Sequence, residues 1–237
     1  MMEISIVVPA YLEAGNLVNI LPALNQALAP LQAEYEILVV DTAEPMDDTK
    51  GICCANHAVY INRRGGNLYG DAVRTGFECA EGRYIAVMDA DGSHNPYDIP
   101  RLYKRMKRQD PDVVIGSRYC RGGHTENNFI LRFMSWILNV AYRLLFGLKV
   151  KDVSDSFRMY QADQIKRLAL ECDNFDIVEE ILIQLNCRIR DFRAVEIPIT
   201  FSKRAEGKSK RDLIKFIKSY LKTIRRLLAI QKKCKKK

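Results

Sequence analysis

Two aspartates one residue apart, Asp89 and Asp91, form the most informative short motif of the sequence. Side chains alternate between the two faces of an extended segment, so both carboxylates point to the same side. There they can share a hard divalent cation, Mg²⁺ or Mn²⁺, which would in turn neutralise a diphosphate. An isolated motif of this kind is more often an acidic turn, here with Gly92 reversing the chain. Its position directly after an apolar segment favours metal binding, with Asp89 and Asp91 as the ligands.

The motif lies within an alternation of predicted strands and helices. Apolar, β-branched runs predict strands near residues 4–8, 36–40, 58–61, 84–88 and 113–116. Apolar residues at helical spacing predict helices near residues 16–28, 71–80 and 96–109. This alternation predicts a mostly parallel sheet covered on both faces, and such sheets bind ligands beyond the carboxyl ends of their strands. The candidate site therefore includes the residues after the first two strands, namely Pro9, Tyr11, Glu13 and Asp41.

After residue 116 the alternation stops. The pattern predicts a long apolar helix over 128–146, a segment over 152–160, two further helices and a strand over 194–200. We find no internal repeat and no linker rich in Pro, Gly or Ser. We therefore expect one α/β domain over residues 1–210, followed by a basic amphipathic helix and tail over 211–237.

The net charge of +8 is concentrated in that tail. Residues 202–237 contain 15 of the 37 Lys and Arg residues but only two of the 29 acidic residues. Between 213 and 228, apolar residues recur at helical spacing with Lys and Arg between them, which predicts an amphipathic basic helix. Its apolar stripe either packs on the protein's own core or lies on an anionic membrane surface. A basic nucleic-acid-binding module is disfavoured, because no aromatic residues punctuate the basic loop and no RNA-binding motif is present.

Several common classes of protein are excluded by missing motifs. The sequence has neither GxGxxG after its first strand nor GxxxxGK[ST], which argues against a dinucleotide-dependent dehydrogenase and a P-loop NTPase. It has three histidines and no HExxH, so we expect no His-based catalysis and place the histidines at the surface or in loops. The odd number of cysteines and the lack of a signal peptide predict a reduced, cytoplasmic protein. The nearest candidate for a membrane-spanning helix is interrupted by Arg132 and Arg143, which predicts a peripheral protein.

Four segments resemble, in order, the motifs of family 2 glycosyltransferases of the GT-A fold. They are IVVPAYLE at 6–13, VVD at 39–41, MDADGSH at 88–94 and VIGSRY at 114–119. Two later segments, DSFRMY at 155–160 and IPITF at 197–201 with the basic loop after it, are similar to the dolichyl-phosphate mannosyltransferase branch and its bacterial polyprenyl-phosphate relatives. The resemblance covers nearly the whole chain to about residue 210.

The resemblance implies a metal-dependent, inverting transfer of a hexose of mannose or glucose type. The donor would be a GDP- or UDP-hexose and the acceptor a polyprenyl or dolichyl phosphate at the cytoplasmic face of a membrane. Carried over residue by residue, the donor-binding residues are Pro9, Tyr11, Glu13, Asp41, Asp89, Arg204 and Lys210. The acceptor phosphate would be bound by Arg118, Arg132 and Ser135. The catalytic residues would be Asp89, Asp91 and Arg118. An anionic phosphate attacks without a strong base, in agreement with the few histidines.

Three departures from the branch bear on the substrates. Thr42 follows Asp41 where the branch usually has a second Asp, and residues 64–70 replace its Gly-Leu-Gly loop. Asp155-Ser156 replaces its Ser-Gly, which adds a carboxylate near the catalytic edge. These changes indicate a different sugar or nucleotide, or a weakened enzyme.

One alternative acceptor and one partner remain open. A family 2 enzyme acting on a glycan or protein hydroxyl would need a catalytic base, for which Asp155 is the new acidic candidate. Relatives in the branch append transmembrane helices or recruit small membrane subunits, so the resemblance implies a small membrane subunit as a candidate partner. We expect contact with the membrane surface through the basic C-terminal helix, and no nucleic acid partner.

Overall fold

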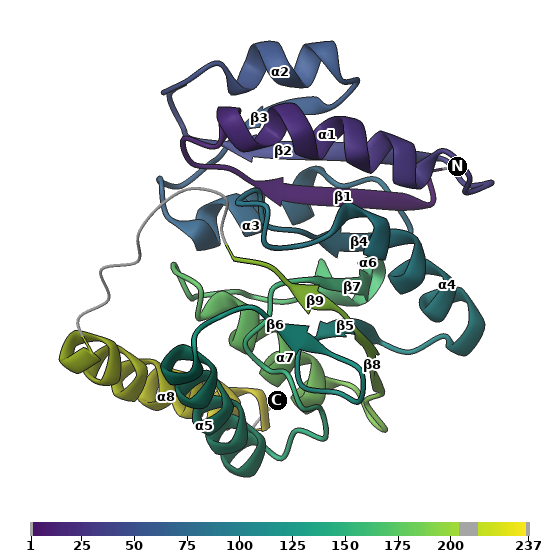
Figure 1. The fold of residues 1–237 in the computed structure, drawn as a ribbon. Coiled ribbons are helices and arrows are strands. Elements are labelled where there is room, and N and C mark those ends of the chain that lie inside the picture. The colour runs from purple at the N-terminus through teal and green to yellow at the C-terminus, as the bar shows by residue number, and fades with distance from the viewer. Residues whose placement is uncertain (1, 204–212, 236–237) are drawn as a thin grey trace.

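The computed structural model describes residues 2–203 and 213–235, and in the last helix the side chains of residues 222–234 (Figure 1). Its centre is a seven-stranded sheet in the order β3-β2-β1-β4-β7-β5-β8. These strands are β1 (Ile4–Pro9), β2 (Tyr35–Asp41), β3 (Val59–Asn62), β4 (Tyr84–Val87), β5 (Val113–Ser117), β7 (Arg158–Gln161) and β8 (Ala194–Pro198). Two short strands, β6 (His124–Thr125) and β9 (Thr200–Phe201), pair with each other beside this sheet.

The strands that matter for the site run parallel. β1 pairs in parallel with β2 and with β4, and β2 pairs in parallel with β3. All six residues of β1 are buried, as expected for a strand of β-branched residues covered on both faces. β7 runs antiparallel between β4 and β5, an insertion that the sequence pattern did not predict. The predicted mostly parallel sheet is confirmed.

Helices cover both faces of the sheet (Figure 1). One core cluster packs α1 (Ala14–Leu28), α4 (Ile99–Gln109) and Cys53 of α2 (Thr49–Ala55) on one face. The other packs α3 (Tyr69–Cys79), α6 (Ala162–Ile165) and α7 (Ile177–Arg188) on the opposite face. Buried residues of α5 (Phe129–Phe146) and α8 (Leu213–Lys235) join this second cluster.

Three details differ from the predicted elements. α2 was not predicted, because its seven residues are too few to show helical spacing clearly. The helix predicted from residue 96 begins with a 3₁₀ turn, η1 (Pro96–Asp98), before α4. The strand predicted over 194–200 is divided, since β8 ends at Pro198, which cannot donate to a strand ladder, and β9 then pairs with β6.

The helix α5 has clear end signals and little cover. The Asn128 side chain accepts a hydrogen bond from Leu131 N at 2.9 Å and caps the first turn, and Gly147 adopts φ 68° just past the last turn. Phe129, Ile130 and Leu144 are 72%, 66% and 80% exposed. Despite its two arginines, α5 is long and apolar enough to cross a membrane by length and composition, although a single helix of that kind is weak evidence for crossing.

The described part of α8 packs on the protein. Leu227 and Ile230 are buried in the core cluster that contains α7, and Thr223 Oγ1 donates to Asp176 Oδ2 at 3.5 Å. Lys233 Nζ lies 3.2 Å from a carboxylate oxygen of Glu171. In this part of the helix, therefore, the apolar stripe faces the core, which was one of the two predicted arrangements.

Candidate active site

The predicted donor-side residues follow the ends of two parallel strands that lie side by side. Pro9 ends β1 and Asp41 ends β2, and both are buried. Tyr11, just beyond β1, is 51% exposed, so it does not belong to the core. Glu13 directly precedes α1 and accepts a hydrogen bond from Asn16 Nδ2 at 2.6 Å. The structure thus brings this set to one edge of the sheet.

Arg63, which the sequence analysis did not single out, supports this edge from within the protein. Its Nε donates to the carbonyl oxygen of Asp41 at 2.9 Å, and its Nη2 donates to the carbonyl oxygen of Ala10. Its Nη1 donates to the carbonyl oxygens of Asn67 and Leu68, each at 3.1 Å. Burial lowers the pKa of Arg63. The guanidinium therefore ties the ends of β1 and β2 to the loop before α3.

The loop after Asp41 begins with Thr42, where the branch has a second acidic residue. Thr42 Oγ1 turns back and donates to the carbonyl oxygen of Glu44 at 2.5 Å. A carboxylate arrives instead from Asp47, whose Oδ2 accepts a hydrogen bond from Ala14 N at 3.0 Å at the start of α1. Asp41 itself accepts a hydrogen bond from Tyr60 Oη at 3.1 Å, while its buried Oδ1 has no hydrogen-bond partner among the described residues. The Asp47 carboxylate thus lies at the start of α1.

Asp89 and Asp91 follow β4, and each is held in place by hydrogen bonds. Tyr69 Oη donates to Asp89 Oδ1 at 2.9 Å, and Ser156 Oγ donates to Asp89 Oδ2 at 2.8 Å. The hydroxyl of Ser93 donates to Asp91 Oδ1 at 2.5 Å. Burial, and then the charge of Asp91, raise the pKa of Asp89 above its usual value. Both hydroxyls on Asp89 come from segments where the sequence departs from its branch.

The chemistry of this pair fits a hard divalent cation. Both groups are carboxylates, and their mutual repulsion favours a cation between them. Over residues 2–203 and 213–235, no cluster of three or more His, Cys, Asp or Glu side chains is arranged to hold a metal. Two carboxylates suffice where the remaining ligands are water and substrate phosphates, which is how Mg²⁺ is usually bound.

His94 corrects the expectation for the histidines. It lies in a loop as predicted, but it is only 2% exposed and its ring stacks on Phe157 with centroids 4.8 Å apart. Its Nδ1 accepts a hydrogen bond from Asp89 N at 3.2 Å, which leaves Nε2 as the donor to Asp155 Oδ1 at 3.0 Å. The sequence could not reveal this burial, because its partner Asp155 is 61 residues away.

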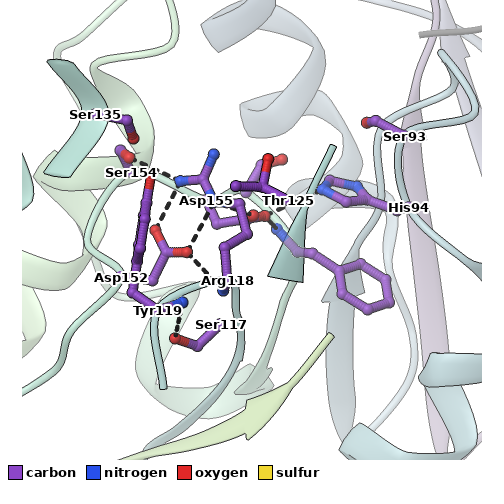
Figure 2. Close-up of polar contacts among 12 residues, drawn as sticks. Ser93, His94, Ser117, Arg118, Tyr119, Thr125, Ser135, Asp152, Ser154 and Asp155 are labelled. Atoms are coloured by element: carbon purple, nitrogen blue, oxygen red, sulfur yellow. Dashed lines mark hydrogen bonds and ion pairs between the residues drawn. The ribbon is translucent and has the colours of Figure 1, made fainter. Parts of the chain in front are cut away.

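Arg118 follows β5 and is paired by two carboxylates (Figure 2). Its Nε and Nη2 donate to Asp152 at 2.8 and 2.7 Å, and Nη2 also donates to Ser154 Oγ at 2.9 Å. Asp155 Oδ2 lies 3.1 Å from Nε. Burial opposes the charge on Arg118, but Asp152 and Asp155 outweigh it and raise its pKa. Burial likewise opposes ionisation of Asp155, but Arg118 and His94 lower its pKa to about 2.

A pocket of about 410 Å³ opens beside Arg118. Its lining comes from the segment after β5, from β6 and from the first turns of α5: Arg118, Tyr119, Cys120, Gly123, His124, Thr125, Phe129, Arg132, Phe133 and Trp136. The rings of Phe129, Phe133 and Trp136 stack in sequence, with centroids 6.2 Å apart at each step. The pocket thus combines two arginines with an aromatic wall.

The three predicted acceptor-phosphate residues are not equivalent. Arg118 and Arg132 line the same pocket. Ser135 is not among the residues that line the pocket, and its hydroxyl lies 3.5 Å from Asn139 Nδ2. Burial raises the pKa of Tyr119, and Ser135 opposes that rise.

Arg204 and Lys210 lie outside the described residues, so their predicted donor contacts stay predictions. The described chain that leads to them lies near both halves of the site. Ser202 N donates to the carbonyl oxygen of Ser93 at 3.0 Å, and Lys203 N donates to Glu126 Oε2 at 3.1 Å.

Two curated relatives are similar to this chain over most of its length. A dolichol-phosphate mannosyltransferase from Pyrococcus furiosus is 33% identical over 234 residues, which is 96% of this chain and 64% of that protein. An undecaprenyl-phosphate mannosyltransferase from Micrococcus luteus is 32% identical over 224 residues, which is 88% of this chain and 87% of that protein. The chain thus spans less than two thirds of the length of the first relative.

Solved structures confirm the GT-A fold. Glucosyl-3-phosphoglycerate synthase from Mycobacterium tuberculosis, in complex with Mn²⁺, uridine diphosphate and glucosyl-3-phosphoglycerate, has a TM-score of 0.71 at 16% identity. The match covers 98% of this chain and 80% of that chain. The sequence model described as Glycosyl transferase family 2 matches residues 5–168. With its strand-end aspartates and motif order, the chain belongs to glycosyl transferase family 2.

Proposed function

We propose that this chain transfers a hexose from a nucleotide diphosphate sugar to a polyprenyl phosphate at the cytoplasmic face of a membrane. One observation carries the proposal. The strand-end aspartates and the pocket with two arginines belong to one connected site, because Asp89 contacts His94, His94 contacts Asp155, and Asp155 contacts Arg118. Such a reaction needs a cation-binding edge for the donor diphosphate and an anion-binding pocket for the acceptor phosphate.

On the donor side, Asp89 and Asp91 would hold the divalent cation. A bound cation supplies the positive charge that stabilises a departing nucleoside diphosphate. Four residues at or just beyond the neighbouring strand ends would contact the base and ribose, namely Pro9, Tyr11, Glu13 and Asp41. We include Arg204 and Lys210 in this set as donor contacts.

On the acceptor side, the lipid phosphate would enter the 410 Å³ pocket between Arg118 and Arg132. Charge-assisted hydrogen bonds from arginines orient a phosphate well. The phosphate oxygen is already anionic near neutral pH, so the protein's task is alignment of the two substrates. A single in-line displacement would then invert the anomeric carbon.

The hydroxyl-acceptor alternative loses its base in this arrangement. The Asp155 side chain is 0% exposed, and its two oxygens face His94 and Arg118. Arg118 and His94, opposing the effect of burial, also hold its pKa near 2, far below that of a useful general base at neutral pH. The contacts of Asp155 with His94 and Arg118 therefore argue against this residue as the base for an acceptor hydroxyl.

Membrane contact would come from two helices. The exposed apolar side chains of α5 adjoin the pocket, so a lipid tail leaving the pocket meets an apolar surface. Lys232 and Lys233 of α8 are exposed and would add attraction to anionic lipids at about 1 kcal/mol per basic residue. In this proposal residues 1–210 form the catalytic domain, and 211–237 form a helix and tail that assist binding, with a small membrane subunit as a further contact.

The proposal is tested with the purified chain, vesicles containing a polyprenyl phosphate, and a panel of GDP- and UDP-hexoses with and without Mn²⁺. We expect metal-dependent formation of a glycosylated lipid phosphate with one donor. Transfer to a soluble glycan or peptide hydroxyl, with none to the lipid phosphate, would contradict it. Full activity without any added subunit would show that a membrane partner is not required.

A further inference from the structure

Two carboxylates lie beside Arg118, but only one of them accepts hydrogen bonds from its guanidinium group. Asp152 receives two parallel hydrogen bonds from Nε and Nη2, and it also accepts the backbone N–H of Arg118 at 2.9 Å. Asp155 Oδ2 lies 3.1 Å from Nε, yet it has no hydrogen bond, because the single Nε proton points to Asp152. The effect of Asp155 on Arg118 is therefore one of charge.

That charge acts in a buried setting. The side chain of Asp155 is 0% exposed and that of Arg118 is 9% exposed, so water screens the pair weakly. Asp155 is not among the residues that line the pocket, so it does not contact a pocket ligand. Because Asp152 already pairs with Arg118, the second carboxylate reduces the positive potential that Arg118 presents to the pocket.

Arg132 lacks such compensation. It is exposed on α5 and lines the same pocket, and over residues 2–203 and 213–235 no carboxylate forms an ion pair with it. The two arginines are therefore unequal toward an anion, although the resemblance assigns both to the acceptor phosphate. Asp155 stands where the branch that this sequence resembles has Ser.

We propose that Asp155 is a specificity-determining residue that limits the affinity of the acceptor pocket for anionic head groups. Arg132 then provides the main cationic contact, and the aromatic wall of Phe129, Phe133 and Trp136 contributes a larger share of acceptor recognition. The inference rests on the proposed function, because it assumes that this pocket receives the acceptor phosphate. It predicts that removal of a carboxylate improves the binding of an anion.

Trp136 offers a direct readout, because it is the only tryptophan and lines the pocket. Its fluorescence is titrated with a short-chain prenyl phosphate and, separately, with the corresponding prenyl alcohol. In Asp155→Ser we expect the affinity for the phosphate to rise by about five- to tenfold, a moderate effect for a buried unit charge near the pocket. The affinity for the alcohol should stay unchanged, since only the charge differs.

Asp155→Asn separates charge from packing. Its amide oxygen can still accept the hydrogen bonds from His94 Nε2 and Phe157 N that Asp155 Oδ1 accepts. We expect the same gain in phosphate affinity, and this variant decides the matter if Asp155→Ser does not fold. Asp98→Ser, which removes a carboxylate that pairs with Arg101 away from the pocket, should change neither titration. Unchanged or weaker phosphate binding in Asp155→Asn overturns the inference.

The outcomes distinguish this inference from the proposed function. If the wild-type chain transfers a sugar to a polyprenyl phosphate but the Asp155 variants show no gain in phosphate affinity, only the inference fails. If the variants gain affinity but no chain transfers a sugar to the lipid phosphate, the proposed reaction fails and the charge effect stands. If Trp136 responds to neither probe in the wild-type chain, this pocket does not receive the acceptor and the inference fails, whereas the proposed reaction is judged by the transfer assay alone.

Discussion

The donor edge and the acceptor pocket hold their charged groups in different ways. At the donor edge, Asp89 accepts hydrogen bonds from two hydroxyl groups, those of Tyr69 and Ser156. At the acceptor pocket, Arg118 is paired by Asp152 and Asp155. The first arrangement fixes an anionic group without cancelling its charge, whereas the second cancels much of a cationic charge.

The difference indicates how each region recognises its ligand. An edge with two neighbouring carboxylates attracts a cation and, through it, a diphosphate. A pocket with a partly neutralised arginine and an exposed aromatic wall depends more on apolar contact. The donor side is therefore expected to respond mainly to changes of charge, and the acceptor side to changes of both charge and apolar surface.

The largest effect is expected at the donor edge. Asp91→Ala removes one of two carboxylates that would hold the cation, and activity should fall by about a hundredfold or more. The stabilisation of the fold by Mn²⁺ with a nucleoside diphosphate should disappear in thermal melts. Asp163→Ala, which removes an exposed carboxylate from α6, should behave as the wild-type chain. An Asp91→Ala variant with an unchanged metal-dependent shift would refute the donor edge as a cation site.

The next effect concerns the aromatic wall. Replacement of both Phe129 and Phe133 by Ser removes two rings that are 72% and 50% exposed, so the fold should be retained. Binding to vesicles of neutral lipid should weaken by about tenfold per ring, since each ring loses its burial in the membrane. Flotation of protein with vesicles measures this. Val18→Ser, at an apolar residue of α1 that is 52% exposed, is the control.

The vesicle experiment also weighs α5 against α8. Charge reversal at Lys232 and Lys233 should weaken binding to anionic vesicles and leave neutral vesicles unaffected. If the Phe129 and Phe133 changes have no effect on any vesicle while the lysine reversal abolishes binding, then α8 alone carries membrane contact. The proposal that the apolar side chains of α5 contact the membrane would then be wrong.

A smaller effect is expected from the exposed arginine of the pocket. Arg132→Ala should raise the KM for the lipid phosphate by about tenfold, the loss of one charge-assisted hydrogen bond, with little change in the KM for the donor. Arg143→Ala on the same helix is the control, because Arg143 does not line the pocket. Steady-state kinetics with each substrate varied in turn separates the two. Equal effects of both substitutions would mean that Arg132 acts only through the net charge of α5.

Local patterns predicted the donor edge but not its supports. Parallel strands place Pro9, Asp41 and Asp89 at one edge whenever apolar runs alternate with helices, so spacing along the chain is sufficient. The hydroxyl groups that hold Asp89 come from Tyr69 and Ser156, which are 20 and 67 residues away. No periodicity carries information about contacts of that range, although both segments stood out as departures from the branch.

The acceptor side was predicted less completely for the same reason. Arg118 was identified from its place after a strand, but its pairing with Asp152 and Asp155 depends on a segment 34 or more residues later. His94 was assigned to the surface or a loop because a lone histidine carries no local sign of burial. The apolar spacing of α5 predicted a helix, but spacing alone does not reveal that its apolar face remains exposed.

The smallest predicted effect concerns a buried carboxyl group of the core, Glu179, and the dependence of stability on pH. Glu179 of α7 is 4% exposed, its Oε2 has no hydrogen-bond partner among the described residues, and burial raises its pKa to about 8. Arg158 and Arg118 oppose that rise, and Asp176 adds to it. Because the pKa of Glu179 lies above 7, its protonated form prevails in the folded state at neutral pH.

A raised pKa in the folded state means that the folded protein binds the proton more tightly than the unfolded chain does. The stability contributed by the protonated carboxyl is therefore complete below the ordinary pKa of 4.5 and is lost as the pH rises to about 8. Glu179→Gln cannot ionise, so its melting temperature should exceed that of the wild-type chain by roughly 5 °C at about pH 8.5, with a smaller gap at about pH 5.5. Exposed Glu44→Gln should show no such divergence. If Glu179→Gln instead melts below the wild-type chain at the higher pH, the carboxylate is ionised and paired in the folded protein. Glu179 would then add a third negative charge to those of Asp152 and Asp155 near Arg118. The positive charge of the acceptor side would be reduced further.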